Sequence, residues 1–326
     1  MKSVVCNAFG PVEQIAVEDQ PTPVPGAGMV LINVKAASIN FPDALMVEGK
    51  YQVKPSLPFV PGMEFAGVVS AVGPGITRVK SGDRVAALSI GAFAEQALAK
   101  ESSVLPLPDH LDFQTAAATF VTYGTALRAL KRCADLKAGE TLLVLGAAGG
   151  VGTAAIEIGK AMGAKVIAAA SSTEKLALCI ELGANYTIDY QKEDLRSRCA
   201  EITGKAGVDV VLDPVGGSYS EDALRSLAWR GRLIIVGFAS GEIPRLPANL
   251  ALLRERSIVG VYWGDSLPRE PQAHEEDSRQ LIQWLAGGEI RPVISDRVAL
   301  SGVGGALRRL LDRHVKGKVL VLPEQS

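Results

Sequence analysis

The segment Leu145–Gly152, LGAAGGVG, has the residue spacing of a phosphate-binding turn, and we call it the glycine turn. Gly149 and Gly152 fill the last two positions of a G-x-G-x-x-G pattern, whereas Ala147 fills the first. Alanine can form this turn if its φ angle stays negative, while Gly149 lets the backbone approach a pyrophosphate and Gly152 lets the helix pack on the strand. The helix that follows would point its amide groups at the phosphates. We therefore predict dinucleotide contacts from Ala148, Gly149, Gly150, Val151 and Gly152; the alternative is a strand-to-helix turn without a ligand.

The end of the next β-type run indicates which dinucleotide is bound. Selection of NAD usually places an Asp or Glu about 20 residues further on, where it binds the ribose 2′-hydroxyl. Here the run ends Ala168-Ala-Ala-Ser-Ser172, without a carboxylate. The hydroxyls of Ser171 and Ser172 and the ammonium of Lys175 favour a 2′-phosphate, and hence NADPH. Lys175 could instead be a solvated helix-face residue, and Glu174 lies close by in sequence.

The metal-binding residue types show no ligand spacing. The four cysteines are far apart and form no C-x-x-C pair, and none lies near a histidine in the sequence. Reduced, mostly buried thiols and surface histidines are the simplest interpretation. A phosphate loop of the G-x-x-x-x-G-K-[ST] type, a G-x-S-x-G elbow and an H-E-x-x-H helix are also absent from the sequence.

Composition restricts the possible partners. The 326 residues are 48% hydrophobic and 21% charged, which is typical of a globular protein with room for two domains. A formal net charge of −1 gives no general attraction to nucleic acid, so we expect none as main partner. We find neither a signal-peptide pattern nor an apolar run long enough to span a bilayer, and we therefore expect a cytoplasmic location and no membrane partner.

Two kinds of pattern must position these residues. Up to about residue 115, short β-type runs alternate with Pro and Gly, which predicts a β barrel or sandwich. A helix is expected over Phe113–Leu130, and strands and helices then alternate from Thr141 to Val236, which predicts a parallel sheet covered on both faces. The fold class is thus α/β. A helix over Asp277–Ala286 and a strand over Lys318–Leu322 complete the chain.

The segment from Ala138 to Gly152, AGETLLVLGAAGGVG, resembles the signature of the quinone oxidoreductase (zeta-crystallin-like) branch of the medium-chain dehydrogenase/reductase superfamily. Glu157 departs from it, because the branch usually has glutamine there. The resemblance implies a GroES-like catalytic domain (residues 1–118), a Rossmann NADPH-binding domain (119–263), a return to the catalytic domain (264–326) and a cleft between the two domains. Agreement extends to the segments Ile39–Asp43, Pro58–Gly67, Gly82–Val85, Val208–Asp213 with Gly216 and Gly217, and Gly231–Arg232.

Zinc alcohol dehydrogenases share this fold, so the metal has to be considered directly. They use an early Cys, the His and Glu of a G-H-E motif, a later Cys or Asp, and a second zinc in a four-cysteine lobe. This chain has Asn40 in the first region, Met63 in place of the His before Glu64, and no cysteine between residues 86 and 101. Amide, thioether and carboxylate do not form the usual N/S zinc site, so we predict no metal. Glu64 would then be a structural carboxylate.

Without zinc, conjugated acceptors are the natural substrates, because hydride transfer to a quinone or an enone needs mainly positioning and a polarising donor. The resemblance implies catalytic roles for Tyr51, which would hydrogen-bond or protonate the acceptor, and for Asn40, which would orient the substrate or the nicotinamide. Alternatively, Tyr51 is an aromatic wall of the pocket and Asn40 is a loop amide that caps backbone groups.

Further cofactor contacts are implied by the same resemblance. Tyr262 and Trp263 could instead be interface or core residues, and Tyr190 could be a tyrosine at the end of a strand. The predicted function is a zinc-independent, NADPH-dependent quinone reductase; the alternatives are an enoyl or alkenal reductase and a non-catalytic, crystallin-like NADPH-binding protein. Ser257–Val261 could be the last strand of the Rossmann sheet and pair in a homodimer. The implied contacts, besides Asn40, are Thr122, Thr125, Tyr190, Phe238, Ser240, Tyr262, Trp263 and Lys318.

Overall fold

The computed structural model describes residues 1–325, which form two compact units that we treat separately. Unit 1 contains Met1–Val121 and the chain from Arg291 onward, and unit 2 contains Thr122–Ile290. The first boundary lies close to the expected one at residue 118. The second differs from the expected boundary at residue 263, because helices α9 (Trp263–Arg269) and α10 (Pro271–Gly287) belong to unit 2.

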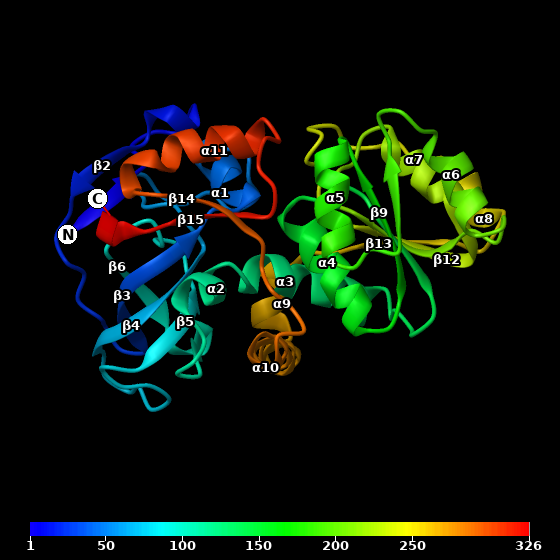
Figure 1. The fold of residues 1–326 in the computed structure, drawn as a ribbon. Helices are drawn as coiled ribbons and strands as arrows, with labels where there is room; N and C mark the ends of the chain where they lie inside the picture. Colours follow the sequence, from blue (N-terminus) through cyan, green and yellow to red (C-terminus); the bar gives the residue numbers. More distant parts are fainter. Residues whose placement is uncertain (326) are drawn as a thin grey trace. The chain divides into compact units, whose positions relative to one another are not determined.

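Unit 1 is built on β-sheets, as its Pro- and Gly-punctuated sequence predicts. Its main sheet has seven strands in the order β14-β15-β3-β4-β5-β7, with β6 paired to β3, and β1 and β2 form a separate ribbon (Figure 1). Every pair is antiparallel except β14 with β15. The C-terminal strand β15 pairs with β3, which confirms that the chain returns to the first β unit. The strands are β1 (Lys2–Val5), β2 (Ala16–Asp19), β3 (Met29–Ser38), β4 (Glu64–Val72), β5 (Arg84–Leu88), β6 (Gln96–Lys100), β7 (Val104–Pro106), β14 (Ile294–Val298) and β15 (Lys318–Val321).

Short helices join and cover these strands. Helix α1 (Phe41–Val47) begins three residues after β3, so the end of β3 carries the chain directly into the residues predicted to act on the substrate. The core of the unit is apolar and includes Ile32, Phe65 and Phe93. The other helices are α2 (Phe113–Ala117) and α11 (Val303–Leu311), with 3-10 turns η1 (Val12–Gln14), η2 (Glu101–Ser103), η4 (Leu300–Gly302) and η5 (Pro323–Gln325).

Unit 2 is a parallel α/β unit with six strands in the order β10-β9-β8-β11-β12-β13, all pairs parallel. Helices α4 and α5 contact β8, β9 and β10, and α7 contacts β11 and β12 (Figure 1). This confirms the doubly wound sheet, and β13 is its edge strand as expected. The elements are β8 (Thr141–Val144), β9 (Lys165–Ala170), β10 (Tyr186–Asp189), β11 (Val208–Asp213), β12 (Leu227–Ile235), β13 (Ser257–Gly260), α4 (Gly150–Ala161), α5 (Thr173–Glu181), α6 (Leu195–Ile202), α7 (Tyr219–Ser226) and α8 (Asn249–Leu252).

The single helix expected over Phe113–Leu130 is wrong in detail. Helix α2 ends at Ala117, α3 covers Phe120–Leu127, and a π-helical turn, η3, follows over Arg128–Cys133. The amide of Val121, in the first turn of α3, donates to Glu64 Oε2 at 2.8 Å. The break therefore places a backbone N–H against a buried carboxylate, a tertiary contact that helical periodicity does not contain.

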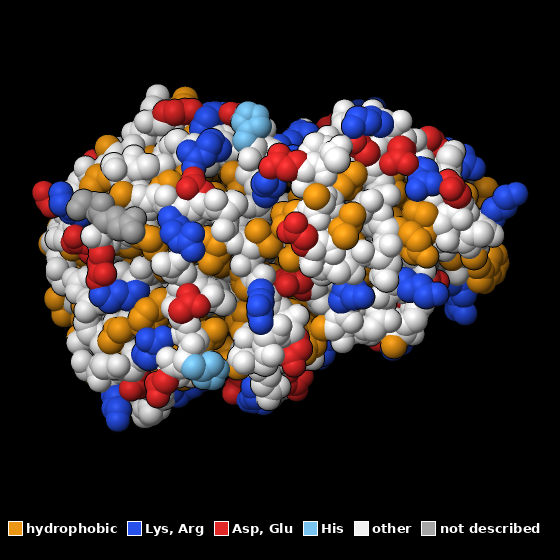
Figure 2. All heavy atoms as spheres, viewed as in Figure 1, with side chains coloured by type: hydrophobic (Ala, Val, Ile, Leu, Met, Phe, Trp, Pro, Cys, Tyr) orange, Lys and Arg blue, Asp and Glu red, His pale blue; other side chains and the backbone are white. Residues whose placement is uncertain are grey.

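The charged side chains of the two signs are mixed on the surface. On the face that Figure 2 shows, Lys and Arg side chains are interspersed with Asp and Glu side chains. Within residues 1–325, every helix is too short or too polar to cross a membrane.

Candidate active site

The glycine turn joins β8 to α4, and its backbone explains the alanine. Gly146 has the left-handed conformation, with φ of 56°, whereas Ala147 keeps a negative φ. The Ala147 amide donates to the Ala169 carbonyl at 3.0 Å, which holds the turn against β9. The requirement that we stated for alanine is therefore met.

The two later glycines of the turn differ in how tightly they are packed. A Cβ on Gly152 would lie 2.4 Å from the Gly146 carbonyl oxygen and 2.7 Å from the carbonyl carbon of Ala147, so no side chain fits there. A Cβ on Gly149 would meet only that same Gly146 oxygen, at 3.3 Å. Gly149 is the N-cap of α4 and has no side chain to bond the first amides of the helix. Those amides have no acceptor within the helix, which is the arrangement that binds phosphate.

The residues predicted to hold the 2′-phosphate lie together at the ends of β9 and β10. Ser172 is the N-cap of α5 and accepts from the Lys175 amide at 3.3 Å. The Lys175 ammonium reaches back to Ser171 Oγ, also at 3.3 Å. Tyr190 joins them through its amide, which donates to the Ala170 carbonyl at 3.2 Å, and its ring packs on Tyr219 with centroids 4.6 Å apart.

The loop that carries Phe238 and Ser240 is tied to the loop after β11. The amide of Ser240 donates to the Val215 carbonyl at 2.8 Å. Asp213, the last residue of β11, accepts from the amides of Val215 at 2.8 Å and Gly216 at 2.9 Å. Because β8, β9, β11 and β12 are parallel, these loops and the glycine turn lie at the same edge of the sheet, where ligands of such folds bind.

Thr122 and Thr125 lie on α3, one turn apart, and Trp263 packs against Gly124 of the same helix. A Cβ on Gly124 would be 2.7 Å from Trp263 Cζ2, so the glycine is needed to admit the indole. Thr122 is buried and Tyr262 is exposed. Trp263 thus contributes to packing within unit 2, which agrees with the core role that we gave as an alternative.

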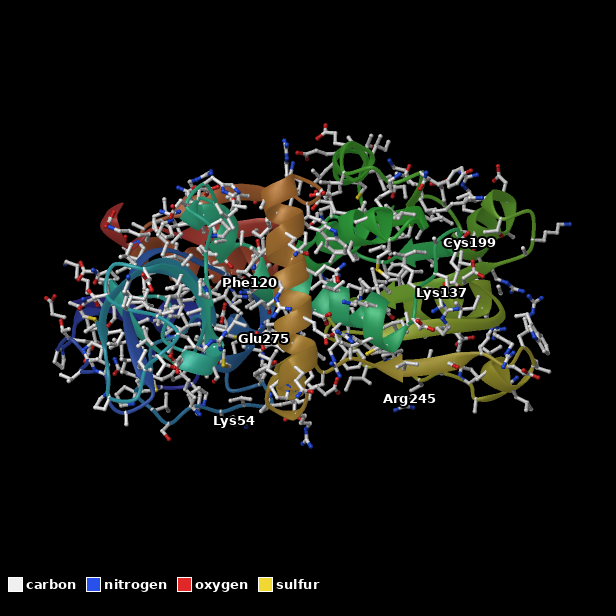
Figure 3. All side chains as sticks on the ribbon, turned by 90° about the horizontal axis from the view of Figure 1, so that it is seen from below. Lys54, Phe120, Lys137, Cys199, Arg245 and Glu275 are labelled. Carbon is white, nitrogen blue, oxygen red and sulfur yellow. The ribbon has the colours of Figure 1, made fainter. Side chains whose placement is uncertain are left out.

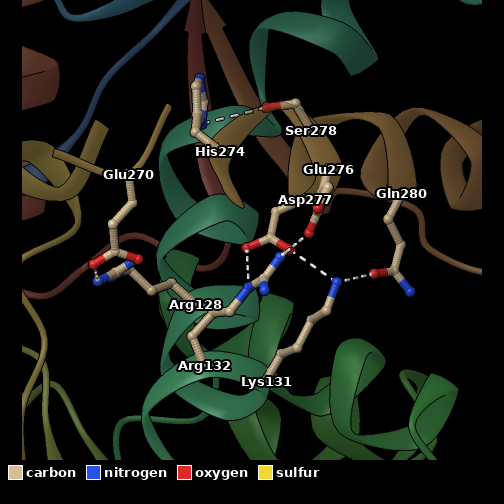
Figure 4. A network of polar contacts seen from close by, with 9 residues as sticks. All are labelled: Arg128, Lys131, Arg132, Glu270, His274, Glu276, Asp277, Ser278 and Gln280. Carbon is tan, nitrogen blue, oxygen red and sulfur yellow. Dashed lines mark hydrogen bonds and ion pairs between the residues drawn. The ribbon is translucent and has the colours of Figure 1, made fainter. Parts of the chain in front are cut away.

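An ion-pair network holds α10 in unit 2 and explains the shifted boundary (Figure 4). Asp277 of α10 accepts from Lys131 at 2.9 Å and from Arg132 at 2.8 Å, and Glu276 accepts from Arg132 at 2.8 Å. Arg128 binds Glu270 at 2.9 Å. All three cations belong to η3, so the long helix that carries Glu275 in Figure 3 is fixed to the segment that follows α3.

Glu157, the position that departs from the family signature, lies on α4, and its side chain is buried. Its carboxylate accepts a hydrogen bond from the hydroxyl of Tyr123. Burial and the neighbouring carboxylate raise the pKa of the Tyr123 phenol well above its usual value. This bond connects α4 to α3, a role that the sequence analysis did not assign to Glu157.

In unit 1 the structure gathers four polar residues that we call the Glu64 cluster: Ser38, Asn40, Glu64 and Lys318. Glu64 Oε1 accepts from the Ser38 hydroxyl, from Asn40 Nδ2 at 3.0 Å and from Lys318 Nζ at 2.8 Å. Lys318 Nζ also donates to Asn40 Oδ1 at 2.5 Å. All four residues are buried. The predicted residues Asn40 and Lys318 are therefore in contact, and Glu64, expected only as a structural carboxylate, joins them.

Asp43 lies beside this cluster in the first turn of α1. Its Oδ2 accepts from the Asn40 amide at 2.7 Å, and its Oδ1 has no hydrogen-bond partner among the described residues. Burial raises the pKa of Asp43 to about 8, while the Asn40 hydrogen bond and the Lys318 charge lower it. Asp43 is therefore an acid that holds its proton near neutral pH.

Tyr51 follows α1 and the left-handed Gly49, whose φ is 68°. Its amide donates to the Leu45 carbonyl at 3.1 Å, and its side chain is half-buried against the apolar core of unit 1. This packing agrees with the alternative in which Tyr51 is an aromatic wall. The role of its hydroxyl as a proton donor belongs to the proposed function.

The residues of unit 1 do not fit a zinc ion. Glu64 Oε1 already accepts from three donors, one of them the Lys318 ammonium, and Met63 is packed against the apolar core. Zinc prefers thiolate, imidazole and free carboxylate ligands in tetrahedral geometry. No group of three His, Cys, Asp or Glu side chains placed to hold a metal occurs within residues 1–325.

Comparison with known proteins gives the family. Residues 26–109 match the model of the alcohol dehydrogenase GroES-like domain, and residues 150–287 match that of the zinc-binding dehydrogenases. The chain is 39% identical to the quinone oxidoreductase-like protein 2 homolog of Nematostella vectensis, over 99% of this chain and 89% of that protein. It is 33% identical to human quinone oxidoreductase, over 99% of this chain and 98% of that protein.

A solved structure agrees over the same length. The quinone oxidoreductase of Escherichia coli complexed with NADPH superposes with a TM-score of 0.92 at 29% identity, covering 99% of this chain and 100% of that one. The solved structure, the sequence relatives and the two family models therefore agree on the same family. The chain belongs to the quinone oxidoreductase branch of the medium-chain dehydrogenase/reductase superfamily.

Proposed function

We propose that this chain is a zinc-independent, NADPH-dependent oxidoreductase that reduces quinones. The observation that carries the cofactor assignment is the group formed by Ser171, Ser172 and Lys175 at the end of β9, where an NAD-selecting carboxylate would stand. Two hydroxyls and one ammonium complement a phosphate dianion. The glycine turn at the same sheet edge supplies backbone amides for the pyrophosphate.

The cofactor, when bound, supplies a hydride, and the chain has to bind, orient and provide a proton. Reduction of a quinone by one hydride needs one proton to complete the hydroquinone, and oxidised cofactor is released. The Tyr51 hydroxyl donates that proton to the quinone oxygen in this proposal, and bulk solvent returns it. Thr122, Thr125 and the residues of the Glu64 cluster orient the reacting groups.

Zinc independence rests on the donor set of unit 1. The carboxylate of Glu64 is engaged by an ammonium, and amide and thioether groups replace the thiolate and imidazole of the zinc enzymes. A resident zinc would compete with Lys318 for the same oxygen, and the buried ammonium would repel it. Metal analysis of the purified protein, with activity measured before and after chelator treatment, tests this part of the proposal.

The acceptor is tested by steady-state rates. The purified protein is assayed with NADPH against a panel of quinones, α,β-unsaturated ketones and aldehydes, and an enoyl thioester. Fast quinone turnover supports the proposal. Fast enone or enoyl turnover beside flat quinone rates would assign the alternative, an enoyl or alkenal reductase, and NADPH binding without turnover of any acceptor would assign a non-catalytic binding protein.

We further propose a homodimer formed through β13. This strand pairs on one side only, with β12, and Ile258 on it is 41% exposed. Trp229 is 60% exposed and Leu252 is 78% exposed on neighbouring elements of the same unit. An uncovered strand edge beside apolar side chains favours pairing with a second copy. Sedimentation of Ile258→Lys should show a monomer if wild type is a dimer, and a monomeric wild type would overturn this proposal.

A further inference from the structure

Helix α3 is held inside unit 2 by two contacts from adjacent residues. The hydroxyl of Tyr123 donates to Glu157 Oε2 of α4. Gly124 lies against the indole of Trp263, since a Cβ on Gly124 would be 2.7 Å from Trp263 Cζ2. Tyr123 and Glu157 are both buried, so water competes little for their hydrogen bond. The raised pKa of the Tyr123 phenol keeps its hydroxyl protonated, and it therefore remains a donor.

The periodicity of the helix decides what these two contacts control. Successive residues of an α-helix are turned by about 100° around its axis. Tyr123 and Gly124 are therefore centred on one side of α3, whereas Thr122 and Thr125, three residues apart, are centred on the opposite side. The two contacts thus set the rotation of α3 about its axis, and this rotation sets the direction in which the threonines point.

Helix α4 gives the hydrogen bond a fixed anchor. A Cβ on Gly159 would be 2.8 Å from Leu142 Cδ2 of β8, so the helix is packed closely on the sheet. Gly152, seven residues earlier and therefore on the same side of α4, is packed as closely on the glycine turn. Glu157 lies between these two glycines in the sequence, so its backbone has a fixed position relative to the turn.

We propose that Tyr123 and Glu157 are positioning residues for hydride transfer. Their hydrogen bond holds the rotation of α3, and with it Thr122 and Thr125, in a fixed orientation relative to the phosphate-binding end of α4. This inference rests on the proposed function, in which the threonines orient the reacting groups and the glycine turn binds the pyrophosphate. Tyr123 and Glu157 act through the threonines and need no contact with either ligand.

Three variants separate this role from a contribution to stability alone. Tyr123→Phe keeps the ring and removes the donor, Glu157→Gln keeps an acceptor and removes the charge, and the double variant lacks both the donor and the charge. We expect the Tm of Tyr123→Phe to fall by about 4–8 °C, because a buried carboxylate loses a hydrogen bond. The double variant should recover much of that loss, because a neutral amide is easier to bury than a carboxylate.

Activity should follow the hydrogen bond rather than the Tm. We expect kcat to fall about tenfold in Tyr123→Phe and in the double variant, because the reacting groups are displaced. The Kd for NADPH, titrated by nicotinamide fluorescence, should stay unchanged, because the phosphate-binding end of α4 is intact. Glu157→Gln keeps a neutral version of the bond, so its kcat should stay within about threefold of wild type.

A kinetic isotope effect identifies the step that is slowed. With NADPH deuterated at C4 of the nicotinamide, the isotope effect on kcat in Tyr123→Phe should be at least as large as in wild type, because hydride transfer itself is slower. A reduced kcat with a smaller isotope effect would place the loss in another step and overturn the inference. The acceptor is whichever panel member wild type reduces fastest, so failure of the quinone assignment does not affect this test.

Fluorescence of NADPH bound at saturation tests the same role without turnover. A nicotinamide that is held less firmly emits less, so the emission should be lower in Tyr123→Phe than in wild type. If no acceptor is reduced, the proposed function fails, whereas this difference would still support the inference.

The matched control is Tyr186→Phe. Tyr186 is the first residue of β10 in the same unit, and its side chain is 47% exposed. This substitution should leave Tm, Kd, kcat and nicotinamide emission unchanged. A folded Tyr123→Phe with the kcat and the nicotinamide emission of wild type would overturn the inference. Glu157→Gln with the Tm of wild type but the activity of Tyr123→Phe would overturn it as well.

Discussion

The glycine turn of unit 2 and the Glu64 cluster of unit 1 both belong to the proposed site, but they are built in different ways. The turn is made of consecutive residues and offers backbone amides, with no ionised side chain among Leu145–Gly152. The cluster joins residues as far apart in sequence as Asn40 and Lys318, separated by 278 positions, and it buries one carboxylate and one ammonium. Local backbone geometry thus positions the first, whereas tertiary packing and charge pairing position the second.

This difference predicts different kinds of failure. A turn that depends on close backbone packing fails when atoms are added, because the chain has no room to move. A buried ion pair fails when one partner is removed, because the other charge remains in a medium that solvates it poorly. Substitutions that add atoms to the turn and substitutions that remove a charge should therefore differ in their effects on binding and on stability.

The largest effect is expected at Gly152. Gly152→Val adds atoms 2.4 Å from the Gly146 carbonyl oxygen, so the turn and the first turn of α4 must separate. We expect NADPH affinity to fall by about 100-fold or more, since a displacement of about 1 Å at a binding group costs this much. The free energy of unfolding should fall by about 1–3 kcal/mol. Fluorescence titration and urea unfolding measure the two quantities.

Gly305→Ala is the matched control for this substitution. Gly305 lies on an exposed position of α11, and a Cβ there meets nothing within 4 Å. We expect unchanged NADPH affinity and a gain of about 0.5–1 kcal/mol in stability, because alanine favours the helix. Normal NADPH affinity in Gly152→Val would show that the turn is not the phosphate site.

The contrast also explains what the sequence could predict. The glycine turn, the parallel sheet after it and the group of Ser171, Ser172 and Lys175 follow from residues that are close in sequence, and all are found where the pattern places them. The role of Glu64 depends on four segments meeting, and no local spacing encodes this. The clue that remained was chemical: a glutamate directly before the apolar run Phe65–Val69 needs a partner if it is buried.

The attachment of α10 was missed for a related reason. Arg128, Lys131 and Arg132 look like a solvated helix face, and so do Glu276 and Asp277. Their pairing across about 145 residues is a property of the folded chain, and it moves the expected boundary from residue 263 to residue 290. The break between α2 and α3 likewise follows from the Glu64 contact to the Val121 amide rather than from propensity.

The second effect concerns Asp43, which stands beside the buried charges of unit 1. Because folding raises the pKa of Asp43 to about 8, the unfolded chain releases this proton first. Its contribution to stability is therefore largest at low pH and is lost as the pH rises from about 4 to about 8. Within this window the loss is at most about 1.4 kcal/mol per pH unit.

Asp43→Asn should remove this dependence. The variant keeps an oxygen to accept the Asn40 amide, and urea unfolding at several pH values measures the difference. We expect the stability of wild type relative to Asp43→Asn to decline between pH of about 4 and about 8. Parallel stability curves for the two proteins would mean that Asp43 is ionised in the folded state, and that the cluster tolerates a second buried carboxylate.

The smallest effect is expected at Lys175, the one charged group with which unit 2 would hold the cofactor. Lys175 is half-buried at the start of α5, and its ammonium reaches Ser171 Oγ at 3.3 Å. Because this side chain is partly exposed, Lys175→Ala should change stability little. It should raise the Kd for NADPH by about tenfold, with little change for NADH, because one charge-assisted bond to the 2′-phosphate is lost. Lys137→Ala is the control, because Lys137 is a surface lysine of the same unit that pairs with Asp135. Equal losses for NADPH and NADH in Lys175→Ala would contradict the 2′-phosphate assignment. A large fall in stability would instead show that the cofactor-binding end of this unit, like the Glu64 cluster, depends on a paired charge, and the contrast between the two regions would fail.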